Sequence, residues 1–370
     1  MRPNRNNAAD ETRNAHPYFM WEHMHEQPAA LLSARARSRS EALEFARRIV
    51  DAPSIVLSGI GSSLHAAMLG EYWLHAVGGL GAARARNSFE HLHYGAAAAP
   101  GAAIIAISHR GWREFPARLA AGGNLDRIVK AAICGEDPHR GALAADFVFI
   151  TTAQEKSGAH TKSLTGALAI LLEIAIETAI ARGEQSRPLS IRREFAEVPA
   201  MLERRLSYPS AERAAAGRFR NYRRIVLLGA GPAYPCAREG ALKLKEATFT
   251  YAEALETEAF LHGPIASLDA ETLLILISTG PSPRLAEVAR AAGEIGAARL
   301  AFVTGPGDEL ADFVDETIRV EGRNEATSPF AIILSLQLFT YFSALARGFN
   351  PDRNRLDDPR YARAAKHFEL

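Results

Sequence analysis

The chain has 370 residues, 48% of them hydrophobic, and carries 43 lysines and arginines against 42 aspartates and glutamates. A net charge of +1 gives no excess of positive charge for nucleic acid or an anionic membrane, so we expect neither as a partner. The two cysteines, Cys134 and Cys236, have no metal-binding or disulfide spacing; we therefore expect no metal, no redox cofactor and a reducing, cytoplasmic location.

The first fifty residues precede the regular part of the pattern. Residues 1–16 are polar and rich in Asn and Arg, without the apolar stretch of a secretory signal, and we expect them to be disordered. Residues 17–50 are predicted to form a helical segment, in which Glu26-Gln27-Pro28 precedes an Ala- and Arg-rich helix from about Ala29 to Val50.

Residues 51–183 alternate between short apolar runs and helical patterns. Strands are predicted at Ile55–Ser58, Ala103–Ile107, Ala131–Cys134 and Phe147–Ile150, and helices over Leu64–Ala76 and from Trp112 onward. Continuous apolar runs of this length are typical of parallel strands that are covered on both faces. The apolar stretch Gly166–Ala181 contains two glutamates, Glu173 and Glu177, so we interpret it as a buried helix and not as a membrane span.

The same layout returns in residues 221–350, after a polar helical linker at 184–220. Strands are predicted at Arg224–Gly229, Leu273–Ser278 and Leu300–Val303, and helices through Lys243, over Arg284–Ala298 and over Ala326–Arg347. Ile55 and Ile225 open equivalent units 170 residues apart. The sequence therefore predicts an α/β protein with two doubly wound parallel-sheet domains in tandem, followed by a tail at 351–370.

Two loops of the first unit have the composition of an anion site. Gly61-Ser62-Ser63 and Ser108-His109-Arg110-Gly111 each follow a buried strand and precede a predicted helix, at the sheet edge where open α/β proteins bind ligands. A serine N-cap gives the first pattern for purely structural reasons, so that loop alone does not decide. The equivalent loops of the second unit contain Pro232 and Pro281, which lack N–H donors, and we expect one anion site per chain.

A short helix in the second unit carries a group of charged residues. Glu239, Lys243 and Glu246 are related by i,i+4 and i,i+3 steps and share one helix face. A lysine beside carboxylates on an apolar helix suits proton transfer, because burial moves both kinds of pKa toward neutrality. An exposed salt-bridge helix has the same spacing, so the pattern alone leaves both interpretations open.

The stretch from Glu239 to Glu246, followed by His262-Gly263-Pro264, resembles the signature of the isomerase half of glucosamine-6-phosphate synthase, a double sugar-isomerase (SIS) domain. Three other stretches resemble the same family: Ile60–Ala66 its "CGTSYHA", Ser108–Arg113 its "SQSGET", and Ala153–Lys162 its "AGPEIGVASTKA". The resemblance covers roughly residues 18–350 by motifs and implies two SIS domains without the glutaminase domain.

The resemblance also implies roles for individual residues. Glu246 would be the base that moves a proton between neighbouring carbons of an opened sugar, and Lys243 would orient the site. His262 would assist ring opening from a neighbouring subunit, which implies a homodimer with a shared active site. Gly158, Ala159 and His160 would contact the sugar, largely through the backbone.

The chain departs from the family at several positions. Arg110 and Arg113 replace a serine and a threonine, and we expect at least Arg113 to contact the substrate phosphate or a second anionic group. His160 stands where the family usually has serine. The family's Schiff-base lysine falls near Asp358, and Lys366 is a candidate replacement further along the tail. No early cysteine matches a glutaminase nucleophile, so we do not expect the chain to take ammonia from glutamine unaided.

These observations favour a phosphosugar-binding enzyme that acts on a hexose 6-phosphate or its amino derivative, by isomerisation or deamination. Two alternatives stay open. A deglycase of 6-phosphofructosyl-amino acids needs no Schiff-base lysine, and the extra carboxylate of its substrate would suit added arginines. A non-catalytic phosphosugar sensor is the other alternative, but a sensor needs neither Glu246 nor His262, which favours the enzyme.

Overall fold

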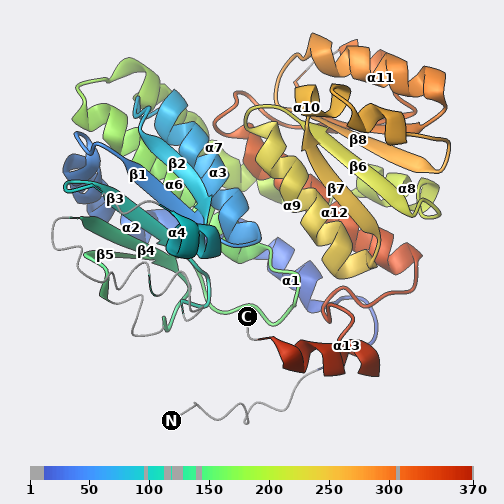
Figure 1. Ribbon diagram of the computed structural model, residues 1–370, viewed down its shortest axis with the longest axis horizontal. Helices are drawn as coiled ribbons and strands as arrows, with labels where there is room; N and C mark the ends of the chain where they lie inside the picture. Colours follow the sequence, from blue (N-terminus) through green and yellow to red (C-terminus); the bar gives the residue numbers. More distant parts are fainter. Residues whose placement is uncertain are drawn as a thin grey trace.

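The computed structural model describes residues 12–95, 99–111, 118, 128–138, 144–305 and 309–368, which contain two five-stranded sheets (Figure 1). The first sheet consists of β1 (Ile55–Gly59), β2 (Ala83–Asn87), β3 (Ala103–Ile107), β4 (Val129–Cys134) and β5 (Phe147–Ile150). The second consists of β6 (Arg224–Gly229), β7 (Tyr251–Glu256), β8 (Thr272–Ser278), β9 (Ala298–Thr304) and β10 (Glu316–Val320).

The two sheets have the same strand order. It is β2-β1-β3-β4-β5 in the first and β7-β6-β8-β9-β10 in the second, and every neighbouring pair is parallel. This is the flavodoxin-like order of doubly wound proteins. The predicted α/β fold class with two parallel sheets is therefore confirmed.

The sequence analysis did not predict three of the strands, and all three lie at sheet edges. They are β2, β7 and β10. β2 alternates between alanine and arginine before Asn87, and its burial alternates with it, because an edge strand keeps part of its surface in water. β8 shows the opposite case, since all seven of its residues are buried in the middle of the second sheet.

The second sheet is covered on both faces. Helices α9 (Ala233–Thr248) and α12 (Ser328–Ala346) pack on one face, where Leu273, Ile275 and Ile277 of β8 point. Helix α11 (Pro283–Ile295) packs on the other face, against Leu274 and Leu276, with the short α10 (Thr257–Leu261) beside it. The period-two alternation of strand side chains thus builds two separate apolar layers.

The first sheet packs against helices on the side that faces the second domain. These are α2 (Gln27–Ile49), α3 (Ser62–Ala76) and α6 (Lys162–Ala181). Helix α4 (Ser88–Tyr94) packs against β1 and β2, whereas the helix predicted from Trp112 lies outside the described residues. One continuous cluster of buried apolar residues extends from β1 through these helices to α9, α12 and β6, so the two domains share a core.

The predicted buried helix is confirmed as α6, which is enclosed by α2, α3 and α7 (Ser186–Ser207). Its two glutamates form ion pairs with arginines there. Glu173 accepts from Arg35 Nε at 2.9 Å, and Glu177 accepts from Arg192 Nη2 at 2.6 Å. Helices α6 and α12 are long and apolar enough to cross a bilayer by length and composition, and 89% of each such stretch is buried inside the protein.

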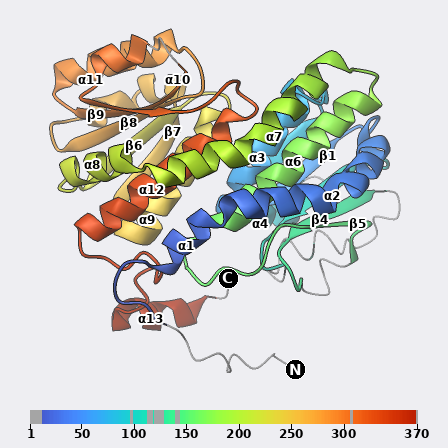
Figure 2. The ribbon, with the colours of Figure 1, turned by 180° about the vertical axis from the view of Figure 1, so that it is seen from behind.

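The remaining helices connect the domains and the ends of the chain. Helices α7 and α8 (Ser210–Arg218) fall within residues 184–220, and α7 contacts α2 and α6 of the first half as well as α12 of the second. Helix α1 (Phe19–His25) packs against α12, and the tail helix α13 (Pro359–Ala364) lies below both sheets (Figures 1 and 2).

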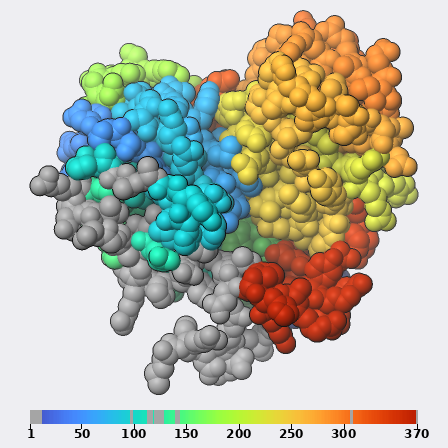
Figure 3. Space-filling view, in the orientation of Figure 1, coloured from blue at the N-terminus to red at the C-terminus, as the bar shows by residue number. Residues whose placement is uncertain are grey.

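The internal repeat extends to the loops that follow β1 and β6. A Cβ at Gly59 would lie 2.4 Å from the backbone carbon of Ser63, and one at Gly229 would lie 2.6 Å from that of Ala233. Both turns therefore require glycine where the strand runs into its helix. The two helices that follow, α3 and α9, pack against each other where the two lobes meet (Figure 3).

Candidate active site

The charged face of α9 is buried at the junction between the domains. Lys243 Nζ lies 2.5 Å from Glu246 Oε2 and 3.5 Å from Glu239 Oε1. The side chains of Glu239 and Lys243 are each 1% exposed, whereas that of Glu246 is 23% exposed. An exposed salt-bridge helix is therefore excluded. The group is a buried lysine between two carboxylates, of which only Glu246 reaches solvent.

The two carboxylates differ in their electrostatics. Burial raises the pKa of Glu239, but Lys243 and the hydrogen bond from His65 outweigh burial and lower it below the ordinary value. Burial also raises the pKa of Glu246, and here the opposing effect of Lys243 is not enough to lower it. Burial lowers the pKa of Lys243, but Glu246 and Glu239 more than reverse this, so the ammonium stays charged. Two carboxylates with opposite pKa shifts are typical of acid–base sites.

Helix α3 of the first domain holds Glu239 in place. Ser62 Oγ donates to Glu239 Oε1 at 3.0 Å, and His65 Nδ1 lies 2.7 Å from Glu239 Oε2. The hydroxyl of Ser62 is thus used between the domains, although the sequence suggested that it binds an anion. Within the predicted anion loop, Ser63 N also donates to Ile60 O, at 3.2 Å, and Gly61 has a φ of 59°.

The second predicted anion loop follows β3. Ser108 N donates to Ile133 O at 2.9 Å, and Gly111 N closes a turn onto Ser108 O at 2.8 Å. The ring of His109 packs against Gly135, directly after β4, where a Cβ would lie 2.6 Å from His109 Cε1. Arg110 is half-buried beside it. Arg113, from which we expected a phosphate contact, lies outside the described residues.

The loop from residue 153 to 162 brings further groups to the junction. Glu155 is a buried carboxylate that accepts from Thr161 N at 2.8 Å and from Ser163 N at 2.9 Å, at the start of α6. Burial raises the pKa of Glu155, but the adjacent ring of His23 and the hydrogen bond from Ser163 bring the pKa well below the usual range. The sequence analysis missed Glu155 and His23, whose side chains lie 3.2 Å apart.

His160 connects this loop with α9. Its ring centroid lies 5.5 Å from that of His109, edge to face. Burial lowers the pKa of each ring to about 4, so both are neutral near pH 7. The positive charge of Lys243 contributes to the low pKa of His160. The ring of His160 therefore lies close enough to the buried lysine for the two groups to interact electrostatically.

The backbone N–H groups of Gly158 and Ala159, which the resemblance assigned to the sugar, are bonded within the protein, that of Gly158 to the tail. Gly158 N donates to Asp352 O at 2.7 Å, and a Cβ on Gly158 would lie 2.8 Å from that oxygen and from Asn354 Cγ. Ala159 N donates to Ser157 Oγ at 3.2 Å. The N–H groups of Gly158 and Ala159 thus both have partners inside the protein.

The Gly158→Ala substitution is expected to loosen the tail. The new methyl group would meet a backbone oxygen that has to shift, so we expect a loss of about 1–3 kcal/mol of unfolding free energy. Faster proteolytic cleavage within residues 350–368 should accompany it. Gly280→Ala is the matched control, because a Cβ there meets nothing within 4 Å. Equal stability and cleavage for both variants would contradict this packing role.

His262 lies apart from the α9 group within one chain. Its side chain is 76% exposed at the end of α10, and its Nε2 lies 3.3 Å from Glu258 Oε1. It makes no ion pair with Glu246 in the part of the chain that the structure describes. In the tail, Asp358 caps α13 by accepting from Arg360 N at 2.9 Å, and Lys366 is exposed in the short helix Ala365–His367.

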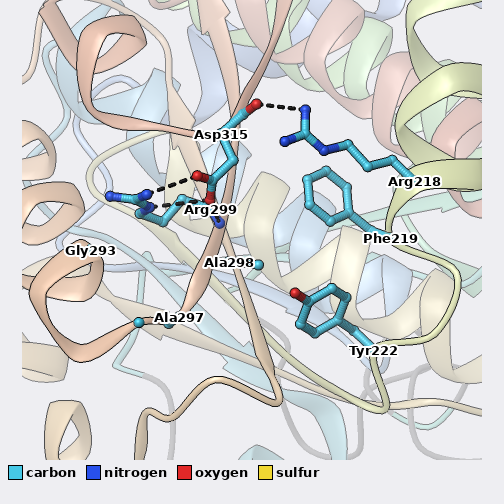
Figure 4. A pocket seen from close by; sticks show the side chains of 9 residues that line it. Arg218, Phe219, Tyr222, Gly293, Ala297, Ala298, Arg299 and Asp315 are labelled. Carbon is cyan, nitrogen blue, oxygen red and sulfur yellow. Dashed lines mark hydrogen bonds and ion pairs between the residues drawn. The ribbon is translucent and has the colours of Figure 1, made fainter.

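A separate hollow of about 380 Å³ lies at the opposite edge of the second sheet, where β9 and β10 begin (Figure 4). Its two guanidinium groups are already paired. Arg299 Nη2 lies 2.8 Å from Asp315 Oδ1, and Arg218 Nη1 lies 2.7 Å from Glu316 Oε2. Because these charges offset one another, the hollow lacks the free positive charge of an anion site, and we place the candidate active site at the α3–α9 junction. No cluster of three or more metal-ligating side chains occurs among the described residues.

Comparisons with known proteins agree with this fold. Residues 218–347 match the model of the SIS domain family, so the second half contains a SIS domain. The chain is 30% identical over 353 residues to the glutamine--fructose-6-phosphate aminotransferase [isomerizing] of Thermococcus kodakarensis, covering 92% of this chain and 57% of that protein. It is 29% identical over 371 residues to the Legionella pneumophila protein of that name, covering 94% and 59%. The chain thus spans little more than half of these relatives.

Solved structures are similar to this chain at the level of the fold. The C-terminal domain of glucosamine-fructose-6-phosphate aminotransferase from Francisella tularensis superposes with a TM-score of 0.81 at 21% identity, covering 92% of this chain and 99% of that one. Tagatose-6-phosphate ketose/aldose isomerase from Escherichia coli gives a TM-score of 0.75 at 21% identity, covering 93% and 96%. The first half of the chain lies outside the family match but has the strand order of the second.

Proposed function

We propose that the chain is an enzyme that binds a hexose 6-phosphate or an amino-sugar 6-phosphate and catalyses its isomerisation or deamination. The observation that carries this proposal is the pair formed by Glu246 and Lys243. A partly exposed carboxylate of raised pKa lies 2.5 Å from a buried, charged lysine, on a helix that the glycine- and serine-containing loop after β1 contacts through Ser62. The names of the relatives, which include isomerising aminotransferases and a ketose/aldose isomerase, support the same chemistry.

In this mechanism Glu246 removes a proton from the carbon beside the carbonyl of the opened sugar and returns it to the neighbouring carbon. Negative charge develops on the sugar oxygen during this transfer. The ammonium of Lys243, which its two carboxylates keep protonated, supplies a fixed positive charge for that oxygen. The loops after β1 and β3 would hold the phosphate at the carboxyl edge of the first sheet.

The exposed position of His262 fits a role in a neighbouring subunit. We propose a homodimer in which His262 of one chain assists ring opening in the site of the other. We also propose domain limits of 51–183 and 221–350, with a segment at 17–50, a linker at 184–220 and a tail at 351–370. The two buried, unpaired cysteines fit a reducing compartment, so the cytoplasm is the location that we propose.

One observation favours a deglycase as the second candidate. Asp358, near the family's Schiff-base lysine, caps α13, and Lys366 is exposed in the structure of the single chain. A reaction that splits a 6-phosphofructosyl-amino acid needs no Schiff base. Incubation with fructose 6-phosphate, glucosamine 6-phosphate and a 6-phosphofructosyl-amino acid separates the candidates, because the enzyme should consume one of them. Binding without turnover of any would favour a sensor, and no binding at all would overturn the proposal.

The pH dependence of turnover should respond to Glu239. A base must be deprotonated, so the rate should fall as pH falls through the raised pKa of Glu246. The charge of Glu239 contributes to that raised pKa, so Glu239→Gln is expected to move the acid limb of the profile to lower pH. The control is Glu253→Gln, at an exposed position on β7. If the acid limb of the pH–rate profile stays in place or moves to higher pH in Glu239→Gln, the charge of Glu239 does not raise the pKa of Glu246.

A further inference from the structure

The carboxylate of Glu239 is bonded to two side chains of the first domain. Ser62 Oγ donates to Oε1 at 3.0 Å, and His65 Nδ1 lies 2.7 Å from Oε2. The lowered pKa of Glu239 keeps this carboxylate ionised near neutral pH, and an ionised carboxylate can only accept. His65 Nδ1 therefore donates. It can do so with a charged ring or a neutral one, because the imidazolium and one neutral tautomer both carry a hydrogen on Nδ1.

The ammonium of Lys243 is not shared equally between its two carboxylates. Its Nζ lies 2.5 Å from Glu246 Oε2 but 3.5 Å from Glu239 Oε1, and only the shorter distance is that of a charge-assisted hydrogen bond. Among the residues that the structure describes, Lys243 is the one side-chain donor to Glu246, whereas Glu239 has two other donors. The ammonium thus bonds the carboxylate that has fewer partners of its own.

Burial gives the hydrogen bond from His65 its effect. The side chain of His65 is 7% exposed and that of Glu239 is 1% exposed, so solvent has little access to either. A buried acceptor that loses its donor costs about 1–3 kcal/mol. Lys243 Nζ is already 3.5 Å from the same carboxylate, and a short movement would restore a donor to Glu239. The same movement would take the ammonium away from Glu246.

Few other charges act on this group. Burial is the main cause of the raised pKa of Glu246, and the charges that modify it belong to Lys243, Glu239 and Glu155. Helix α12 and strand β8, which also pack against α9, contain no charged residue. The other ionisable residues described on α3, β6 and β7 are bonded elsewhere or exposed: Glu71 to Ala85 N, His75 to Ala83 O, Arg224 to Asp269, Glu256 to the start of α10, and Glu253 in solvent.

We propose that His65 is a positioning residue of the candidate active site, whose hydrogen bond to Glu239 keeps the ammonium of Lys243 directed at Glu246. This inference rests on the proposed function, in which Glu246 is the base and Lys243 supplies positive charge. A side chain of the first domain then adjusts the base on the second domain and needs no contact with the substrate. The competing explanation is that the i,i+3 spacing of Lys243 and Glu246 alone fixes the ammonium.

The test is the titration of Glu246 in ¹³C spectra of glutamate-labelled protein without substrate, with Glu246→Gln to assign the signal. His65→Leu removes the donor, so the ammonium should move toward Glu239 and the midpoint of Glu246 should rise. We expect a rise of about one pH unit, the lower end of the shift that an opposite charge in contact produces. The acid limb of the pH–rate profile should move to higher pH with it, because a base must be deprotonated. His65→Asn, whose amide can donate, should recover part of the shift.

A double variant shows whether the effect passes through Glu239. His65→Leu combined with Glu239→Gln should titrate like Glu239→Gln alone, because no second carboxylate remains to attract the ammonium. An unchanged midpoint in His65→Leu, a lower one, or an equal rise in both backgrounds overturns the inference. If His65→Leu does not fold, Ser62→Ala removes the other donor and should also raise the midpoint, and an unchanged midpoint there overturns the inference. Absence of phosphosugar turnover in the unsubstituted protein overturns the proposed function instead.

Discussion

Glu246→Gln is expected to reduce turnover of the phosphosugar substrate by about 10³-fold while leaving its binding within a few-fold of the unsubstituted protein. A positioned general base contributes 10²–10⁴-fold to such a reaction, and glutamine keeps the size of glutamate but takes up no proton. The measurement is kcat and KM for whichever compound is consumed, together with a direct binding titration.

The control for this substitution is Glu253→Gln on β7, an exposed carboxylate that is not part of the α9 group. It should retain full activity. If Glu246→Gln keeps more than about a tenth of the turnover, the base is another group, and the raised pKa of Glu246 has only a structural cause. A loss of binding in place of turnover would assign Glu246 to substrate recognition.

Lys243→Met is expected to destabilise the protein by about 3 kcal/mol or more. Removing one partner of a buried ion pair leaves the other uncompensated, and Lys243 lies between two carboxylates, one of them fully buried. Methionine has a similar length and is apolar, so loss of packing adds little. The measurement is the urea midpoint and m-value of unfolding, with Lys245→Met as the matched control, because Lys245 is exposed on the same helix.

A double variant separates charge from packing in this prediction. Lys243→Met combined with Glu246→Gln removes one of the two unpaired carboxylates and should recover part of the lost stability. Lys245→Met should stay within about 0.5 kcal/mol of the unsubstituted protein. If the double variant is as unstable as Lys243→Met alone, the loss comes from packing, and the electrostatic account of the α9 group is wrong.

Strands with largely apolar sequences could be predicted, in the middle of a sheet and, for β5, also at its edge. β3, β5 and β6 begin and end at the predicted residues, and β8 differs by one residue at its start. The missed edge strands β2, β7 and β10 mix polar and apolar residues, since one edge of each lacks a neighbouring strand. Their pairing depends on the strand beside them, which local patterns do not encode.

The candidate site was predictable only where its residues share one element. The i,i+3 and i,i+4 spacing already brought Glu239, Lys243 and Glu246 onto one face of a helix. The use of Ser62 for Glu239 was not predictable, because the two residues belong to different domains and are 177 positions apart. The contact between Gly158 and the tail is of the same kind, since Asp352 O comes from the far end of the chain.

The sequence alone determined the parallel α/β architecture, its repetition and the charged face of α9, because apolar runs and helical spacing are local properties of the chain. The tertiary structure decided which carboxylate is fully buried and which reaches solvent. It also paired Ser62 and His65 with Glu239 and, among the residues that the structure describes, left Nε2 of His109 without a protein partner. These features arise where α3 meets α9 and where the loops after β3 and β5 meet, and burial at such contacts sets the pKa values and hydrogen bonds on which the chemistry depends.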